Sequence, residues 1–404
     1  PYRVEPTEQI TSRLYDSVAF IGPARSAKTE ALVKNPIVHM ILANPRLVHL
    51  VHMSADSARE WSVEELDKLL RNSPELAARK AKGKGADNLL DKRFIGGGRL
   101  TVGYPVVRQL SARSIPLVLI TDADRMPQDI GGEGSVFALG RKRTQSAGSR
   151  GMTVIEASPG FPILDESWTP ATPHQAPPCE GIVGIYNQGT RGRWYWRCPD
   201  CHLEFEPSLE RLHWPNHGTP AERGRAAAMV CLHCGSVIEA RHKAELNRAG
   251  RWLHETRDGG VAPLGEDTRE AATVSYWLKG PAAAFASWSQ VVARILEGEE
   301  LFAATGDEST LKAATNVDGG EPYLPRAKGV AAGLSAAGLR DRATEHAWKA
   351  CPAGTRFVTV AVDVQAGRFV VQVEAWRDGL DRVLVDRFDL VTPPAGAARA
   401  EERA

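Results

Sequence analysis

The sequence contains no apolar run longer than a buried strand, so it offers no candidate for a membrane-spanning helix. Cysteine is scarce, with six residues in 404, which argues against a disulfide-stapled scaffold. Net charge is nearly absent, at +1, so any surface that binds nucleic acid must be local. A content of 43% hydrophobic and 25% charged residues is ordinary for a globular protein of two or three domains. The chain does not begin with methionine, and we expect that it is trimmed at its start.

Residues 18–30, VAFIGPARSAKTE, have the pattern of a strand, a tight turn and a helix start. This is the layout of a phosphate-binding P-loop, in which backbone N–H groups and a lysine bind phosphate and a hydroxyl binds Mg²⁺. Ala27 occupies the position of the second glycine, where it needs a backbone conformation that glycine adopts more easily. Short strings of this kind also occur by chance. The residues expected to bind nucleotide are Gly22, Arg25, Ser26, Ala27, Lys28 and Thr29.

A second stretch, residues 115–127 (IPLVLITDADRMP), is a continuous apolar run that ends in Asp122 and Asp124. Such a run predicts a central parallel strand, and acids at its carboxyl end are expected beside the P-loop. One carboxylate would orient the water shell of Mg²⁺, and another would polarise the attacking water. The alternative is a strand followed by an acidic helix cap. Together, the two stretches favour a nucleoside triphosphatase.

Strand-like and helical segments alternate through the first 160 residues, which predicts a parallel α/β sheet. The predicted strands are 18–22, 47–53, 100–103, 117–120 and 152–157, and the predicted helices are 29–42 and 58–70. Helical character then fades, and prolines and aromatic residues cluster. An amphipathic helix is predicted over residues 282–303, and strands over residues 356–363, 369–376 and 380–390, the first two as a hairpin.

Two C-x-x-C pairs give the most specific metal signal, and their cysteines are Cys198, Cys201, Cys231 and Cys234. Four thiolates complete a tetrahedral zinc site with no open position, so we expect a structural zinc. The gap between the pairs exceeds the usual zinc-ribbon range, and the alternative is free buried cysteines. We expect His202 and His233 to be spectators, and Cys179 and Cys351 to be core or surface thiols.

Three basic stretches allow two interpretations each. Residues 191–197, RGRWYWR, either grip a nucleic acid by its phosphates and bases or pack as aromatics under the metal site. Arg141, Lys142, Arg143 and Arg150 either contact DNA or a neighbouring subunit's γ-phosphate, or form a solvated helix end. Residues 79–85 are either functional or a solvated loop.

Asp363 ends a predicted strand between apolar neighbours, where an acid is costly unless it meets a metal or a hydrogen-bond partner. Carboxylates on strands hold two Mg²⁺ or Mn²⁺ ions in nucleases. Glu374 on the next strand is a candidate companion.

These features occur in the order found in the large terminase subunits of tailed phages, and the chain resembles the lambda-like branch over nearly its whole length. The family's A-Q-x-G-K-T-E corresponds to residues 24–30, its D-E-x-D-R to residues 121–125, and its N-x-x-x-G-x-P-Y to residues 316–323. Its coupling motif S-T-P, which senses hydrolysis, corresponds to Ser158, Pro159 and Gly160, and its V-D-V-Q contains Asp363. By this match Asp122 is the catalytic acid, Thr121 replaces the metal-orienting aspartate, Asp124 belongs to the catalytic segment, and Asp363 binds Mg²⁺ or Mn²⁺ in the nuclease.

The resemblance implies a P-loop ATPase domain over residues 1–165 and an inserted Cys₄ zinc-ribbon-like module over 166–270. A helical junction over 271–350 and the beginning of an RNase H-like nuclease domain over 351–404 follow. It implies an ATP-driven motor that moves viral DNA into the prohead and an endonuclease that cuts concatemeric DNA, with ATP, Mg²⁺ and Zn²⁺ as cofactors. The implied partners are double-stranded DNA, a small terminase subunit, a portal protein and further copies in a ring. The implied location is the cytoplasm of the infected bacterial host, without membrane association.

The differences between this chain and the family motifs lead to further expectations about its activities. Loss of the second loop glycine and of the aspartate at residue 121 predicts weakened handling of Mg-ATP, with slow or neighbour-dependent hydrolysis. The remaining nuclease acids are expected beyond residue 404, so this chain should bind nucleotide without cleaving DNA. The alternatives are another P-loop DNA-dependent or helicase-like ATPase, and a degenerate, non-catalytic prophage protein that binds nucleotide and zinc for assembly.

Overall fold

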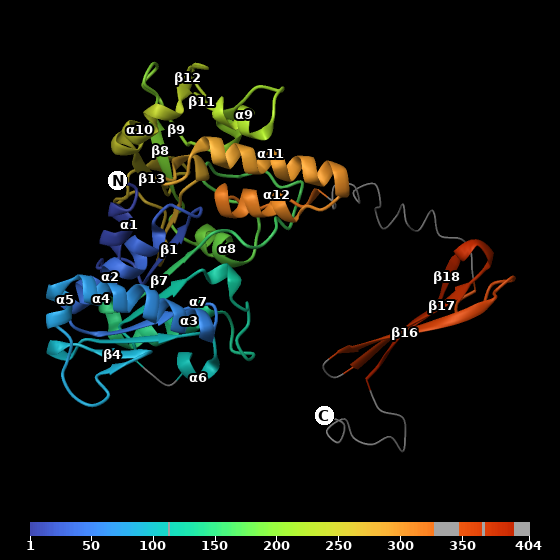
Figure 1. Cartoon of the computed structure of the whole chain (residues 1–404), viewed down its shortest axis with the longest axis horizontal. Coiled ribbons are helices and arrows are strands. Elements are labelled where there is room, and N and C mark those ends of the chain that lie inside the picture. The colour runs from blue at the N-terminus through green and yellow to red at the C-terminus, as the bar shows by residue number, and fades with distance from the viewer. Residues whose placement is uncertain (112–113, 327–346, 366–367, 392–404) are drawn as a thin grey trace. The chain divides into compact units, whose positions relative to one another are not determined.

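The computed structural model describes residues 1–111, 114–326, 347–365 and 368–391. It separates into two compact units, residues 1–329 and residues 330–404 (Figure 1). Within the described ranges, no helix is both long and apolar enough to cross a membrane. The P-loop and the paired cysteines belong to the first unit.

A largely parallel sheet forms the centre of the first unit. Its parallel strands follow the order β8 (Gly192–Arg197), β15 (Thr273–Trp277), β1 (Ser17–Ile21), β7 (Met152–Ala157), β6 (Leu117–Thr121), β2 (Leu47–Val51) and β5 (Arg99–Gly103). Short antiparallel strands extend its edges: β13 (Arg251–Glu255), β14 (Val261–Ala262) and β9 (Glu204–Phe205) at one, β4 (Asp91–Arg93) and β3 (Asp87–Asn88) at the other. The predicted parallel α/β sheet is confirmed. Every residue of β1, β6 and β7 is buried, as expected for strands covered on both faces.

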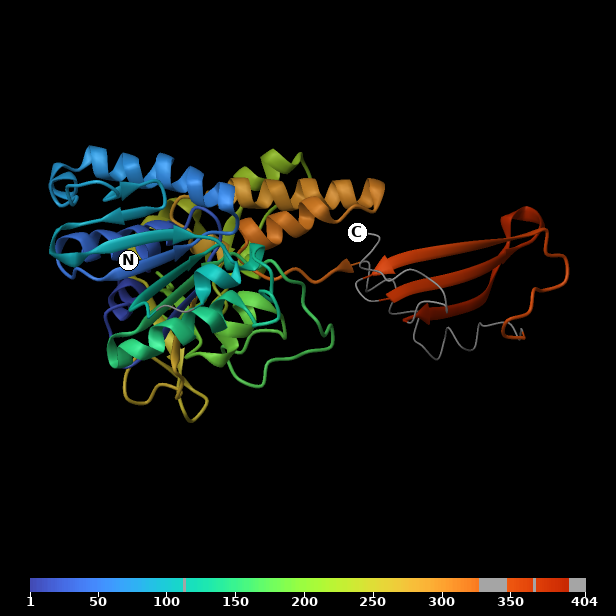
Figure 2. The same ribbon diagram turned by 90° about the horizontal axis from the view of Figure 1, so that it is seen from below.

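Helices cover both faces of this sheet (Figure 2). One face carries α1 (Val4–Gln9), the π-helical η1 (Glu30–Lys34), α2 (Asn35–Leu42), α3 (Ala55–Trp61), the π-helical η2 (Ser62–Leu66), α4 (Asp67–Asn72) and α5 (Pro74–Ala78). The other face carries α6 (Val107–Leu110), α7 (Val136–Thr144) and α8 (Gly181–Gln188). Alternate residues of β1 separate the two cores: Val18 and Phe20 face the first, and Ala19 and Ile21 face the second.

The helices predicted over residues 29–42 and 58–70 are both present, each interrupted by a π-helical turn. In the first, Pro36 is the second residue of α2. A proline within a regular helix lacks an N–H and collides with the carbonyl four residues earlier. The wider turn of η1, in which the Asn35 N–H donates to the Glu30 carbonyl, precedes Pro36 and accommodates it.

The segment that contains the paired cysteines is joined to the central sheet. Strand β8 leads directly into Cys198 and pairs with both β15 and β13. The rest of the segment forms a small antiparallel sheet and two short helices: β10 (Leu212–His213), β11 (Ala228–Val230), β12 (Val237–Glu239), α9 (Pro220–Arg225) and α10 (Lys243–Ala249). The cysteine pairs are therefore attached to the central sheet through one of its own strands.

The amphipathic helix predicted over residues 282–303 is α11 (Trp288–Thr305). It begins after Ser287, whose side-chain oxygen accepts a hydrogen bond from the Gln290 N–H (3.2 Å) and caps the helix. It packs against α9 and against α12 (Ser309–Ala313), which continues into the π-helical η9 (Ala314–Asp318).

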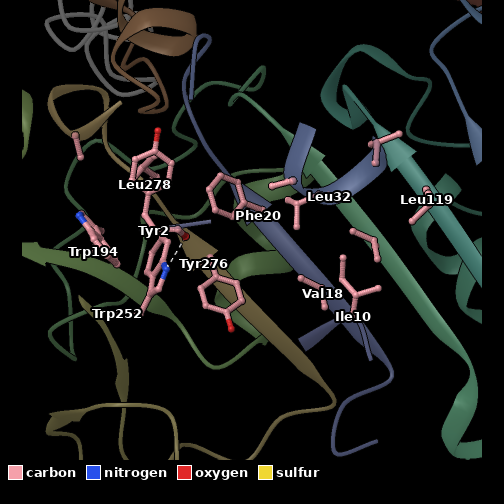
Figure 3. Close-up of a cluster of buried hydrophobic side chains, with 14 of the residues drawn as sticks. Tyr2, Ile10, Val18, Phe20, Leu32, Leu119, Trp194, Trp252, Tyr276 and Leu278 are labelled. Atoms are coloured by element: carbon pink, nitrogen blue, oxygen red, sulfur yellow. Dashed lines mark hydrogen bonds between the residues drawn. The ribbon is translucent and has the colours of Figure 1, made fainter. Parts of the chain in front are cut away.

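Trp194 and Trp196 of the predicted basic stretch lie in the core, and Tyr195 between them is partly buried. Figure 3 shows Trp194 beside Trp252 and Tyr2. Trp194 packs edge-on against Trp252 and Tyr2, and the Trp252 indole N–H donates to the Tyr2 carbonyl (2.8 Å). Trp194 and Trp196 both donate to the side-chain oxygen of Asn247 (3.2 and 3.0 Å). The interpretation of this stretch as aromatic packing is confirmed.

The second unit contains an antiparallel sheet of β16 (Phe357–Gln365), β17 (Arg368–Trp376) and β18 (Arg382–Leu390). The predicted hairpin and third strand are confirmed. Asp363 pairs with Val370 on β17, and Val370 pairs in turn with Asp389 on β18.

Candidate nucleotide site and cysteine cluster

The P-loop connects β1 to η1 at the carboxyl edge of the sheet. Gly22 donates its N–H to the Ala157 carbonyl (3.1 Å), and a Cβ there would lie 2.6 Å from the Phe20 ring, so only glycine fits. The Tyr2 hydroxyl donates to the Ser26 carbonyl (3.0 Å), and the Ser26 hydroxyl donates to the Pro23 carbonyl (2.8 Å). The loop is therefore held in shape by the protein itself.

Ala27 has a φ of +58°, in the left-handed region. This is the conformation expected from its place in the motif, and an alanine there costs roughly 1–2 kcal/mol because of its Cβ. The Ala31 N–H donates to the Ala27 carbonyl (3.1 Å), so the helix begins directly after the strained residue.

Lys28 and Thr29 converge on a carboxylate that the sequence analysis did not select, that of Glu156 on β7. Lys28 Nζ lies 3.7 Å from Glu156 Oε2, and the Thr29 hydroxyl donates to Glu156 Oε1 (3.4 Å). The Thr121 hydroxyl also donates to Oε1. Glu156 is fully buried, which raises the pKa of its carboxyl; the charge of Lys28 lowers that pKa, and the charge of Asp122 raises it.

The strand order explains why Glu156 was missed. Strand β7 lies between β1, which leads into the P-loop, and β6, which ends at Asp122, so the acid nearest to the P-loop lysine belongs to β7. Phe20 of β1 and Thr121 of β6 both pair with Glu156. The available signal was a single acid inside the apolar strand MTVIEA, where an unpartnered charge is costly.

Asp124 links two segments of the site through hydrogen bonds. Its carboxylate oxygens accept from the Gly160 N–H (2.9 Å) and the Ile182 N–H (2.7 Å). Burial raises its pKa to about 6, although both hydrogen bonds lower it. Asp124 thus fixes Gly160 and the start of α8 relative to the end of β6.

A cavity of about 260 Å³ lies beside this link, and Asp122, Asp124, Ser158, Pro159 and Gly160 are among the residues that line it. Asp122 follows β6 in a left-handed conformation (φ 53°, ψ 42°). The Ser158 hydroxyl donates to the Gly22 carbonyl (2.8 Å), which joins the coupling motif to the P-loop. The structure therefore brings the predicted catalytic acids, coupling residues and P-loop into one neighbourhood.

Residues 316–323 close this neighbourhood from the side of α12. The Val317 carbonyl accepts from the Ala24 N–H of the P-loop (2.7 Å). The Gly320 carbonyl accepts from the Trp277 indole (2.7 Å), and Gly320 has a φ of +65° where it passes Pro23. The N-x-x-x-G-x-P-Y segment is thus part of the candidate nucleotide site.

Two of the predicted basic residues, Arg193 and Arg141, bind side chains of this chain, whereas Lys142 and Arg150 are exposed. Arg193 is partly buried between Glu206, to which it is paired (2.9 Å), and the ring of Trp277. Arg141 pairs with Asp16 and lies over the Phe137 ring at the end of α7.

The paired cysteines form a compact cluster in which all four sulfur atoms lie within 4.8 Å of one another. The pairs Cys198–Cys234 and Cys201–Cys231 are each 3.8 Å apart. A tetrahedral ion with bonds of about 2.3 Å requires sulfur separations of about 3.8 Å, so the cluster fits such an ion. His233 Nε2 bonds the Glu204 carbonyl (2.9 Å) instead of joining the cluster.

The structure does not bring Asp363 and Glu374 together. Glu374 pairs with Thr359, four positions along β16 from Asp363, or roughly 13 Å along a strand. Glu374 instead accepts from Gln372 (2.9 Å) and lies 3.5 Å from Arg382.

The fold and the site define a nucleotide-binding protein of the P-loop class with an attached cysteine cluster. The family model for the ATPase domain of the phage terminase large subunit gpA matches residues 1–252, and the model for the gpA endonuclease domain matches residues 273–403. The chain therefore belongs to the phage terminase large subunit gpA family.

Several named phage proteins are similar to this chain. The chain is 24% identical over 412 residues to the terminase large subunit of Enterobacteria phage P21, covering 98% of this chain and 59% of that protein. It also resembles the large terminase ATPase domain of Thermus phage P74-26 (TM-score 0.36, 10% identity, 77% of this chain and 89% of that one). The large terminase of bacteriophage HK97 is a third relative (TM-score 0.38, 11% identity, 96% and 62%).

Proposed function

We propose that this chain hydrolyses ATP to move double-stranded viral DNA into a prohead. The convergence of Lys28, Thr29 and the coupling residue Ser158 at one sheet edge supports this activity most directly. Membership of the gpA family supports DNA as the substrate. The chain spans 59% of the length of its P21 relative, so the activity of a whole terminase is carried over as part of the proposal.

Each residue of the site has its own role in hydrolysis. Lys28 and backbone N–H groups of residues 25–29 bind the phosphates, and the Thr29 hydroxyl would hold Mg²⁺, which supplies positive charge to the transferred phosphate. Asp122 polarises the attacking water. Asp124 positions residues 158–160. These residues transmit the structural change that follows release of the γ-phosphate to the other parts of the motor.

The cysteine cluster would hold a structural zinc ion. Four thiolates occupy every position of a tetrahedral ion, which leaves none for a substrate. The ion would fix the turn that follows β8, and β8 belongs to the sheet that carries the P-loop.

The partners proposed for this motor follow from its family. They are a small terminase subunit, a portal protein and further copies of the chain in a ring, in the cytoplasm of the infected bacterium. The second unit would belong to the endonuclease that cuts concatemeric DNA, with Asp363 as a ligand of Mg²⁺ or Mn²⁺.

The experiment compares ATP turnover by the wild type, Lys28→Ala and Lys68→Ala, each with and without double-stranded DNA. Lys68 is an exposed lysine on α4 and serves as the matched control. We expect DNA to stimulate turnover in the wild type and the control, and Lys28→Ala to lower it at least about 100-fold, because the lysine contacts the transferred phosphate.

Two outcomes would favour other functions. Separation of a forked duplex by the wild type would indicate a helicase-like ATPase. Nucleotide binding that depends on Lys28, without turnover at any DNA concentration, would indicate a non-catalytic assembly protein.

A further inference from the structure

We propose that Glu156 replaces the missing aspartate at residue 121, and that its carboxylate holds the water shell of the Mg²⁺ that accompanies ATP. This inference rests on the proposed function and assigns a role to a residue of the same site. In the gpA-like pattern the acid follows the apolar strand at residue 121, whereas this chain has a threonine there.

In this chain the acid lies on the neighbouring strand β7 instead of at the end of β6. Glu156 on β7 is the register partner of Thr121 on β6, and the Thr121 hydroxyl donates to Glu156 Oε1. Side chains of directly paired residues lie on the same face of a sheet. A carboxylate at residue 156 therefore occupies the same face and the same level of the sheet as one at residue 121 would.

The contacts of Glu156 are those of a functional acid. They consist of the P-loop lysine, the P-loop threonine and Thr121, and Oε2 has no hydrogen-bond partner among the described residues. A fully buried carboxylate facing one ammonium at 3.7 Å does not regain its hydration energy, and an apolar side chain would stabilise the fold as well or better. Oε2, which faces Lys28 but makes no hydrogen bond to a described residue, is available to accept hydrogen bonds from water ligands of a metal held by Thr29.

The rival explanation is that Glu156 merely neutralises Lys28 when no nucleotide is bound. The two explanations differ in what Mg²⁺ does. If Glu156 serves the metal, its loss should weaken the Mg²⁺ complex of ATP and leave ATP without metal nearly unaffected. If it only neutralises Lys28, its loss should tighten the binding of ATP in both conditions, because the phosphates no longer compete with a carboxylate.

The experiment measures the dissociation constant of a fluorescent ATP analogue with Mg²⁺ and with EDTA. The variants are Glu156→Gln and the exchange of the two register partners, Thr121→Asp with Glu156→Thr. We expect Glu156→Gln to reduce the preference for the Mg²⁺ form at least about tenfold, because a neutral amide accepts hydrogen bonds from the water ligands of a metal ion more weakly than a carboxylate does. The exchange variant should recover most of that preference. The affinity of Mn²⁺ in the nucleotide complex, followed by electron paramagnetic resonance, should change in the same order.

An unchanged Mg²⁺ preference in Glu156→Gln, or tighter binding in both conditions, would overturn the assignment. If Glu156→Gln does not fold, the exchange variant decides, because it keeps one acid and one threonine at the same level of the sheet. Failure of the proposed function would give a different result: the affinity for nucleotide would then be the same in the wild type and in Lys28→Ala.

A second inference rests on a different residue, Asn316 of η9. Asn316 is 4% exposed, it lines the cavity that also contains Asp122 and Ser158, and its Oδ1 has no hydrogen-bond partner among the described residues. Its neighbour Val317 is fixed to the P-loop by the hydrogen bond from Ala24. We infer that the Asn316 side-chain oxygen accepts a hydrogen bond from the attacking water and orients that water together with Asp122.

Kinetics of Asn316→Ala test this role, with the exposed Asn72→Ala at the end of α4 as control. We expect kcat to fall about 10–100-fold, in the range for loss of a group that positions a reacting proton, and the affinity for a non-hydrolysable ATP analogue to stay within about threefold. Equal losses of affinity and kcat, or a lowered melting temperature that explains both, would show a structural role instead. An unchanged kcat would also reject the inference.

Discussion

The cysteine cluster and the nucleotide site differ in how their residues are assembled. Each cysteine pair lies within a single turn of the chain, and the two turns are about thirty residues apart. The nucleotide site draws on β1, β6, β7 and η9, which span nearly 300 residues. Local spacing therefore specifies the first site, whereas strand order and register specify the second.

Removal of one cysteine ligand should give the largest effect. Cys231 is buried, and Cys231→Ser should abolish stoichiometric zinc and unfold the segment beyond β8, because structural zinc contributes about 10–16 kcal/mol of binding free energy. Metal content by mass spectrometry and protection from proteolysis measure this. Cys351→Ser, an exposed thiol outside the cluster, is the control and should retain one zinc ion per chain. Equal zinc content in both variants would contradict the Cys₄ assignment.

The next effect concerns the pH dependence of stability through Asp124. Its pKa in the folded state is raised to about 6 from 3.8, so the folded state binds a proton more readily than the unfolded state does. This contribution to stability is therefore present at low pH and is lost as pH rises from about 4 to about 6, by up to roughly 3 kcal/mol at 1.36 kcal/mol per pKa unit.

Asp124→Asn removes this titration. We expect the difference in unfolding free energy between wild type and Asp124→Asn to change in favour of the variant between pH 4 and pH 7, as measured by urea denaturation without nucleotide. A difference that is constant with pH would show that Asp124 has an ordinary pKa. Asp129→Asn, in a loop where the carboxylate accepts from Gly132 and Gly134, provides a comparison at a more exposed acid.

Asn247 of α10 holds β8, the strand that leads into the cysteine cluster, since its side-chain oxygen accepts hydrogen bonds from both Trp194 and Trp196. Asn247→Ala leaves two buried indole N–H groups without that acceptor, so we expect a loss of about 2–4 kcal/mol in unfolding free energy. Asn187→Ala is a comparison on α8, where the side chain bonds the backbone of Ala176. An equal or smaller loss for Asn247→Ala than for Asn187→Ala would argue against a special role of the shared acceptor.

The sequence predicted which helices and strands form more reliably than it predicted which strands lie side by side in the sheet. The strands that carry the P-loop and Asp122, the hairpin of the second unit and all four clustered cysteines were found from local pattern alone. The position of β7 between β1 and β6 was not, because periodicity reports the faces of a strand and says nothing about the strand beside it. Glu156 was missed for that reason. Asn316 was noted only as part of a motif, since its approach to the P-loop depends on packing between segments nearly 300 residues apart.

The smallest expected effect concerns Ala27, which occupies the position of the second glycine in the P-loop motif. Ala27 has a φ of +58°, a conformation that glycine adopts without penalty, so Ala27→Gly should relieve strain. Glycine also loses more backbone entropy on folding, so the net stabilisation should be at most about 1 kcal/mol. Ala77→Gly, at an exposed helical position of α5, should instead destabilise by about 1 kcal/mol. Opposite signs for the two variants in thermal unfolding would show that the P-loop of this chain keeps the glycine conformation although it has lost the glycine, whereas equal signs would mean that the loop has adopted another shape.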